Sequence, residues 1–326
     1  MKRREFITLL GVATIAGPGA AIAQSPKTYR IGLLSALAPP SDSSPFVAPL
    51  IRGLEKLGYM PGRNVVFERR GAEGKVDRLP RLAEELVGSK VDVTVVTGFP
   101  AALALRQVSG VPAVAFAAGD PVATGLVQSL ARPGGNMTGV SDVPTELTAK
   151  RLELLKDLVP NLRRVAMLWN ASDLGMTLRY QASEAAAKVM GIAVQPLGVR
   201  EPDDFEQAFA AMTREKPDAI LMVADSLTTL NRKHVFDFAM ANRLPAIYEF
   251  DFLVRDGGLM SYSVDLDEAM GRVAALVDRI LKGAKPADLP LEQPTHFKFA
   301  LNLKTAKALG LLVPPPLLAR ADEVIE

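Results

Sequence analysis

Short apolar runs alternate with amphipathic stretches along most of the chain. Tyr29 to Ser35 and Val91 to Thr97 are runs dominated by aliphatic residues, which predicts buried strands. Phe46 to Leu57 and Val76 to Gly88 carry their apolar residues at helical spacing. Because the apolar runs are continuous and lie between helices, we expect parallel strands that are covered by helices on both faces.

The same order of elements occurs twice. Arg163 to Trp169 corresponds to the first strand, and Gly191 ends a helix 133 positions after Gly58. Lys216-Pro217-Asp218 precedes an apolar run, as Lys90-Val91-Asp92 does. A nearly constant offset predicts two similar lobes. The fold class is therefore α/β, with two doubly wound, Rossmann-like lobes that have parallel sheets and are joined by a hinge, with hinge strands near 136–140 and 262–265.

The first residues have the order of a secretory signal peptide. Lys2-Arg3-Arg4 is a charged start, Ile7 to Ala16 is a short apolar stretch, and Ala21-Ile22-Ala23 is a small-x-small cleavage site. We expect residues 1–23 to be removed after Ala23, which leaves a soluble protein exported to the periplasm. The paired arginines are compatible with the twin-arginine route and with the Sec route.

Charge and composition narrow the function classes. The net charge is +2, and the leader alone carries three basic residues and one acidic residue, so 35 basic residues balance 35 acidic ones in the remainder. A neutral chain lacks the basic footprint that nucleic-acid binding needs. With no cysteine and two histidines, the sequence predicts no metal site, no cofactor and no catalytic group.

Several segments resemble those of a known family. They are Met1 to Ile7, Gly98 to Ala102, Gly119 to Val122, Arg132 to Gly139, Leu301 to Gly310 and Pro316 to Glu323. Together they resemble the ABC-transporter substrate-binding proteins that include tryptophan-binding members, within the type I periplasmic binding protein fold. Phe99 is a departure, since many members carry a small hydroxyl residue there.

The resemblance implies an organisation and a set of partners. It implies that a helix from about Leu266 to Leu281 returns to the first lobe, so lobe one would comprise 28–140 and about 266–290. Lobe two would comprise 141–265 and a tail of about 291–326. A monomer would bind a small-molecule ligand and dock on an ABC permease in the inner membrane.

Candidate ligand contacts lie where strands end, because ligands of open α/β sheets bind at the carboxyl ends of the strands. A helix start near Thr97-Gly98 offers free amides for a carboxylate, or is an ordinary cap. Carboxylates at strand ends either hold an ammonium group or serve as caps and turns. The candidates are Ser35, Thr97, Gly98, Phe99, Pro100, Ala101, Phe116, Asp120, Trp169, Asn170, Asp225, Ser226, Tyr248 and Glu249.

The aromatic candidates have two interpretations. Phe99, Trp169 and Tyr248 could stack on a flat ligand, or pack at the rim of a sheet. For Phe116, core packing is the favoured interpretation.

Three functions fit the sequence. The preferred one is an extracytoplasmic solute-binding protein of an ABC importer, which holds an amino acid or an aromatic or organic acid in the cleft between the lobes and is not an enzyme. The alternatives are a ligand-binding sensor subunit and a two-lobed enzyme such as a racemase. Racemases of that shape often use paired cysteines, and this chain has none.

Overall fold

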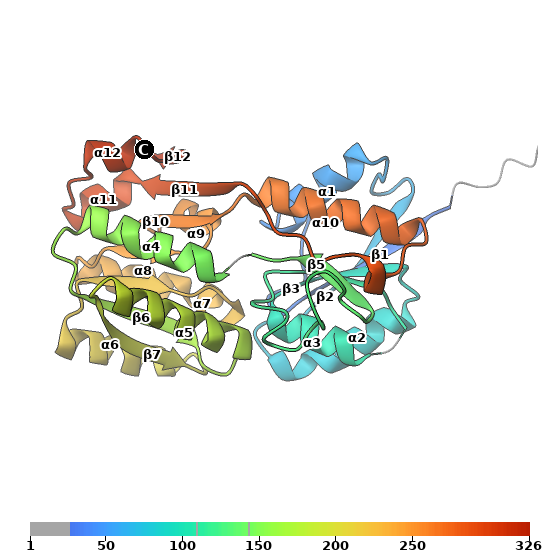
Figure 1. Cartoon of the computed structure of the whole chain (residues 1–326), viewed down its shortest axis with the longest axis horizontal. Coiled ribbons are helices and arrows are strands. Elements are labelled where there is room, and N and C mark those ends of the chain that lie inside the picture. Colours follow the sequence, from blue (N-terminus) through green and yellow to red (C-terminus); the bar gives the residue numbers. More distant parts are fainter. Residues whose placement is uncertain (1–26, 109, 143) are drawn as a thin grey trace, which may run out of the picture.

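The computed structural model describes residues 27–108, 110–142 and 144–326, and the predicted signal peptide lies outside these residues. Two lobes lie side by side, each built on one sheet (Figure 1). The strands are β1 (Tyr29–Ser35), β2 (Val65–Gly71), β3 (Val93–Thr97), β4 (Ala113–Phe116), β5 (Met137–Val140), β6 (Arg164–Asn170), β7 (Ala193–Val199), β8 (Ala219–Met222), β9 (Ala246–Tyr248), β10 (Met260–Val264), β11 (Phe297–Asn302) and β12 (Glu323–Ile325).

Helices flank both sheets. They are α1 (Val47–Lys56), α2 (Leu79–Gly88), α3 (Phe99–Gln107), α4 (Pro144–Leu158), α5 (Leu174–Val189), α6 (Asp204–Glu215), α7 (Ser226–Leu230), α8 (Arg232–Ala241), α9 (Asp251–Arg255), α10 (Leu266–Leu281), α11 (Leu303–Leu309) and α12 (Pro315–Leu318), with single 3-10 turns at Val76–Arg78 and Pro286–Asp288.

The two sheets share one topology, as the repeat predicts. The first has the order β2-β1-β3-β4-β5, and the second contains the equivalent order β7-β6-β8-β9-β10. All described pairings in the first sheet are parallel. The second sheet continues through β11, which runs antiparallel to β10, and then through β12. These two strands at the end of the chain are a departure from the expected purely parallel sheet.

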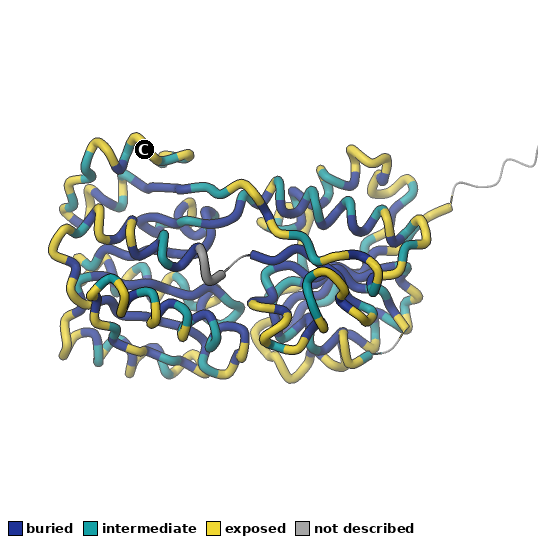
Figure 2. The backbone as a smooth tube through the Cα atoms, in the orientation of Figure 1, coloured by how far each residue is buried: buried dark blue, intermediate teal, exposed yellow. Residues whose placement is uncertain are grey.

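The continuous apolar runs are explained by helices on both faces. In β1, Ile31 and Leu33 belong to the core beneath α1 and α10, whereas Leu34 belongs to the core beneath α2 and α3. In β6, Leu168 faces the core formed with α6 and α8, and Met167 faces the core formed with α4. Figure 2 shows the same arrangement, with buried strands inside each lobe and exposed positions on the outer helices.

The chain passes between the sheets three times within the described residues. It leaves the first sheet after β5 and enters α4, and it leaves the second sheet after β10 and enters α10, which packs on α1. The segment around Glu292 hydrogen-bonds to Gly139 and Ser141 beside β5 and then continues into β11 (Figure 1). The connections therefore lie together on one side, which is the arrangement of a hinge.

No helix in the described part of the chain is both long enough and apolar enough to cross a membrane.

Candidate functional site

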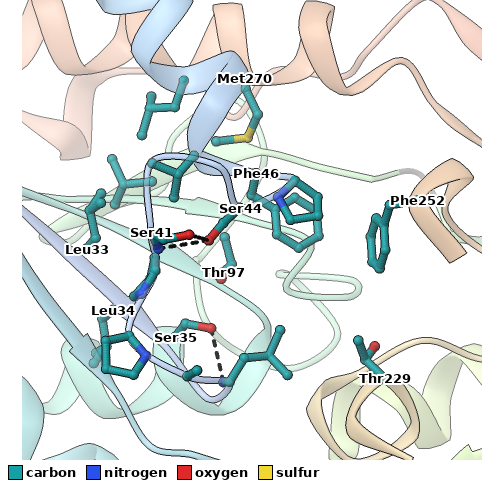
Figure 3. Close-up of a pocket in the computed structure, with 18 of the residues that line it drawn as sticks. Leu33, Leu34, Ser35, Ser41, Ser44, Phe46, Thr97, Thr229, Phe252 and Met270 are labelled. Carbon is teal, nitrogen blue, oxygen red and sulfur yellow. Dashed lines mark hydrogen bonds between the residues drawn. The ribbon is translucent and has the colours of Figure 1, made fainter. Parts of the chain in front are cut away.

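The carboxyl ends of strands from both lobes face each other across a cleft. Two adjoining cavities occupy it, an outer one of about 440 Å³ and an inner one of about 60 Å³. Six residues line both cavities, from both lobes: Ser35, Leu37, Phe46, Thr97, Thr229 and Phe252. Figure 3 shows Thr229 and Phe252 of lobe two across the space from Ser35, Phe46 and Thr97.

The lobe-one wall is formed by the ends of β1 and β3. The hydroxyl of Ser35 accepts a hydrogen bond from the amide of Leu37 at 3.1 Å, which turns the chain away from the strand. Gly98 follows β3 with φ +84°, a conformation that favours glycine, and α3 begins directly after it. The start of α3 has no side-chain cap, and Gly98, Phe99 and Pro100 line the inner cavity.

The lobe-two wall contains Asp225 and Ser226 at the start of α7. One carboxylate oxygen of Asp225 accepts from the backbone amide of Thr228, and the hydroxyl of Thr228 accepts in return from the amide of Asp225, which closes a capping box. The other accepts from the side-chain amide of Asn170. Burial raises the pKa of Asp225, although these hydrogen bonds oppose that shift. Asp225 is thus a helix cap whose carboxylate also lines the inner cavity.

Sequence reasoning missed Asp173, a second carboxylate that lines the inner cavity. Asp173 is 3% exposed and precedes α5, where one of its oxygens accepts from the amide of Met176 at 3.1 Å. Its other oxygen has no hydrogen-bond partner in the described part of the chain. Burial and then the negative charge of Asp225 raise the pKa of Asp173 to about 7. Its place shortly after β6 was the available signal, but any Asp before a helix is also explained as a cap.

Aromatic rings dominate the middle of the cleft. Phe99, Phe250 and Phe252 line the inner cavity, and the ring of Phe46 lies 5.5 Å from that of Phe250 and 5.8 Å from that of Phe252. Of these four, only Phe99 was a sequence candidate. Phe46 and Phe250 directly precede helices and Phe252 lies in the first turn of the short helix α9, where the direction of a side chain does not follow from periodicity.

Three other aromatic candidates pack away from both cavities. Phe116 is fully buried, which agrees with the core-packing interpretation. Trp169 is 8% exposed and stacks on Tyr180 at 3.8 Å, and Tyr248 packs in the core against Phe236.

Glu249 lies in a buried network of charges behind the lobe-two wall. Its carboxylate accepts from Arg151 at 3.0 Å, from Arg179 at 2.7 Å and from the amide of Ala224 at 2.9 Å. Arg179 also donates to Asp142 at 2.6 Å. Burial would lower the pKa of Arg179, but the charges of Asp142 and Glu249 raise it overall. This arrangement occupies both oxygens of Glu249 with protein donors.

The remaining candidates lie at the margins. Asp120 is exposed, and one of its oxygens accepts from the amides of Val122 and Ala123, as in a turn. Ala101 is buried in the first turn of α3, and Asn170 is buried next to Asp225.

The lobes touch on both sides of the cleft. A Cβ placed on Gly119 would lie 3.1 Å from Cα of Gly175, and one on Gly175 would lie 3.2 Å from Cβ of Phe99. On the other side, a Cβ on Gly74 would lie 2.9 Å from Leu230. Glycines therefore permit the close approach of lobe one to the start of α5.

The described residues contain no group of three or more His, Asp or Glu side chains that could hold a metal ion. The cleft instead combines an uncapped helix start, aromatic rings and two carboxylates. Such a site can bind a small molecule that has both charged and apolar parts.

Comparison with known proteins gives a consistent result. The family model described as ABC transporter substrate binding protein matches residues 41–325. A curated protein named "Tyrosine-binding protein" from Clostridioides difficile (strain R20291) is 27% identical over 262 residues, which are 80% of this chain and 75% of that protein.

Two solved structures are also similar. The ABC domain from Streptococcus pneumonia in complex with L-Trp is 28% identical, with a TM-score of 0.84 over 92% of this chain and 100% of that one. A conserved domain protein from Vibrio cholerae is 26% identical, with a TM-score of 0.85 over 91% and 100%. A periplasmic binding ribose operon repressor protein from Lactobacillus acidophilus, 15% identical with a TM-score of 0.54 over 83% of this chain and 96% of that one, shares the fold.

Proposed function

Because the chain belongs to the ABC transporter substrate binding protein family, whose members are binding proteins and not enzymes, we propose that it captures an amino acid with an aromatic side chain. The ligand lies in the cleft between the lobes and is passed to an ABC permease in the inner membrane. The observation that carries this proposal is the cleft itself, in which aromatic rings, a helix start and two carboxylates line one cavity.

The charged groups of the cleft suit a zwitterion. The start of α3 has no side-chain cap, so its free amides can receive the carboxylate of the ligand. Asp225 lies on the opposite wall and can face the ammonium group. Phe99, Phe250 and Phe252 line the same cavity and can contact the side chain of the ligand. A tyrosine-binding relative and a structural neighbour in complex with L-Trp support the same ligand class.

Binding between lobes also requires their division and movement. We propose that lobe one comprises 28–140 with about 266–290, and that lobe two comprises 141–265 with a tail of about 291–326. The contact of α10 with α1 and the place of β11 and β12 in the second sheet support these boundaries. The protein is proposed to act as a monomer.

Export to the periplasm is proposed from the first residues of the sequence. Cleavage after Ala23 would leave a mature chain that begins at Gln24. Intact-mass measurement of protein from the native host should show this mature chain. A cytoplasmic protein that retains Met1 would contradict the proposed export.

The ligand assignment is tested by calorimetry on protein that has been unfolded and refolded to remove any bound ligand. L-tyrosine, L-tryptophan and L-phenylalanine should bind, whereas L-alanine and L-glutamate should bind weakly or not at all. Thermal shift gives an independent readout, because a ligand at 100 times its dissociation constant stabilises the folded state by about 2.7 kcal/mol. Tight binding of a sugar, and of none of the amino acids, would contradict the proposal.

A further inference from the structure

The buried charges around the inner cavity do not balance. Arg179 pairs with Asp142 and Glu249, and Arg151 pairs with Glu249. Asp173 and Asp225 lie on the cavity side of this network, and neither has an ion pair with a cationic side chain of the described residues. Two buried arginines are therefore accompanied by four buried carboxylates. The two carboxylates without an arginine partner, Asp173 and Asp225, both line the cavity.

Asp173 is the less satisfied of these two carboxylates. Asp225 receives hydrogen bonds on both oxygens, from Thr228 and from Asn170. Asp173 receives a hydrogen bond on one oxygen only, from the amide of Met176. Its second oxygen is buried and has no partner among the described residues. A buried polar atom without a partner is costly, so a bound group that supplies a donor would stabilise this arrangement.

The lining of the inner cavity favours a cation as that group. Among the described residues that line it there is no Lys, Arg or His, and Asp173 and Asp225 are its only charged side chains. Phe250 and Phe252 line the same cavity as the carboxylates, and aromatic rings also attract cations.

We propose that Asp173 and Asp225 together form the binding site for a cationic group of the ligand, such as a primary ammonium. This inference rests on the proposed function, since it assigns one end of the ligand in the same cleft. A primary ammonium has three donors, which is enough to reach the free oxygen of Asp173 and the carboxylate of Asp225 at once. Ligands without a cation would supply neither the missing donor nor a compensating charge and should bind more weakly.

Ligand capture should consequently depend on pH. Two charged groups face Asp173 from lobe two: Asp225 raises its pKa, and Arg179, itself paired with Asp142 and Glu249, lowers it. From lobe one, Phe99 and the backbone of Ala118 lie close to Gly175 beside it, and neither carries an ionisable side chain. Since burial leaves the pKa of Asp173 at about 7, a bound cation would displace a proton near neutral pH.

The experiment compares L-tryptophan, tryptamine and 3-indolepropionate by calorimetry at pH 6 and pH 8, in two buffers with different ionisation enthalpies. The amines stay protonated at both pH values. We expect L-tryptophan to bind about tenfold more weakly at pH 6 than at pH 8 and to release close to one proton at pH 6. Tryptamine should bind with the same pH dependence, and 3-indolepropionate should bind at least tenfold more weakly than L-tryptophan.

The key variant is Asp173→Asn, which removes the charge but keeps an oxygen to accept from Met176. It should lose more than tenfold in affinity at pH 8, and it should lose both the pH dependence and the proton release. Asp173→Ser, which also caps helices well, carries the same expectation if the Asn variant does not fold. The matched control is Asp120→Asn, because Asp120 also accepts amides beside the cleft but is exposed. The control should bind as the parent does.

The outcomes separate the two proposals. If 3-indolepropionate binds as tightly as L-tryptophan, or if Asp173→Asn keeps the affinity and pH dependence of the parent, the cation site is overturned and the transport role stands. If none of the three compounds binds, the aromatic ligand class of the proposed function is overturned, and this inference with it.

Discussion

Substitution of Glu249 by Gln tests whether this residue stabilises lobe two or contacts the ligand. Glu249 is 1% exposed and accepts hydrogen bonds from Arg151, Arg179 and the amide of Ala224. Gln retains the shape of the side chain but has one oxygen acceptor in place of two and carries no charge. Two buried arginines would then share the single remaining carboxylate of Asp142.

The expected loss of stability is large. Breaking a buried ion pair by removing one partner costs about 3–5 kcal/mol, because the other charge remains buried without compensation. A typical folded protein has a free energy of unfolding of about 5–15 kcal/mol. Glu249→Gln should therefore lower the urea concentration at the unfolding midpoint of lobe two by a large fraction.

The assay can be confined to lobe two. Trp169 is the only tryptophan of the chain and lies in β6, so its fluorescence follows the unfolding of this lobe. Asp157→Asn is the matched control, since it removes an exposed ion pair with Arg320 in the same lobe. Asp157→Asn should lower the free energy of unfolding by about 1 kcal/mol or less. If Glu249→Gln keeps the midpoint of the parent but loses ligand affinity, Glu249 is a ligand contact and the structural reasoning is refuted.

Two further predictions concern closure and pH. Gly175→Val should weaken ligand binding by more than tenfold while the free energy of unfolding without ligand changes by about 1 kcal/mol or less, because the added methyl groups meet Phe99 and Ala118 of lobe one when the lobes are together. A Cβ on Gly175 would also lie 3.2 Å from the carboxylate of Asp173 in its own lobe, so closure is measured separately: small-angle scattering that shows an unchanged closed form with ligand would contradict this prediction. The ligand-free protein should lose stability as the pH rises from 5 to 8, because folded Asp173 (pKa about 7) holds a proton that the unfolded chain has already released. Asp173→Asn should remove about 2.6 kcal/mol of this dependence between pH 5 and pH 8, measured as urea midpoints at both pH values; equal slopes for parent and variant would refute it.

The topology was predictable because it follows from periodicity and repetition. Continuous apolar runs become parallel strands when both faces are covered, and β1 has the bounds expected from the sequence. The offset between the halves reappears as one strand order in both sheets. The antiparallel strand β11 was not expected, since it lies outside the repeated part and its pairing with β10 depends on a long return of the chain.

The candidate site was only partly predictable. Ser35, Thr97 and Asp225 line the cavities because they end or follow strands whose carboxyl ends meet at the cleft. Trp169 and Tyr248 also lie at strand ends, but their side chains point into layers of packed aromatic residues. Sequence position alone does not decide between these directions. The role of Asp173 depends on an oxygen without a partner, which is a property of the assembled structure.

The charge network also bears on where the proposed bending between the lobes would occur. Arg179 holds Asp142, which follows β5, and Arg151 donates to the backbone oxygen of Tyr262 in β10, so the network ties two connecting segments to lobe two. Glu249 also accepts a hydrogen bond from the amide of Ala224, next to Asp225, so the charge network reaches the wall of the cleft. Because these contacts are buried and charged, they hold the lobe-two wall of the cleft as one rigid unit with the nearby ends of the connections. We therefore expect hinge motion on the lobe-one side of these contacts, and we expect the carboxylates to meet the ligand already in place, which reduces the entropy that binding must lose.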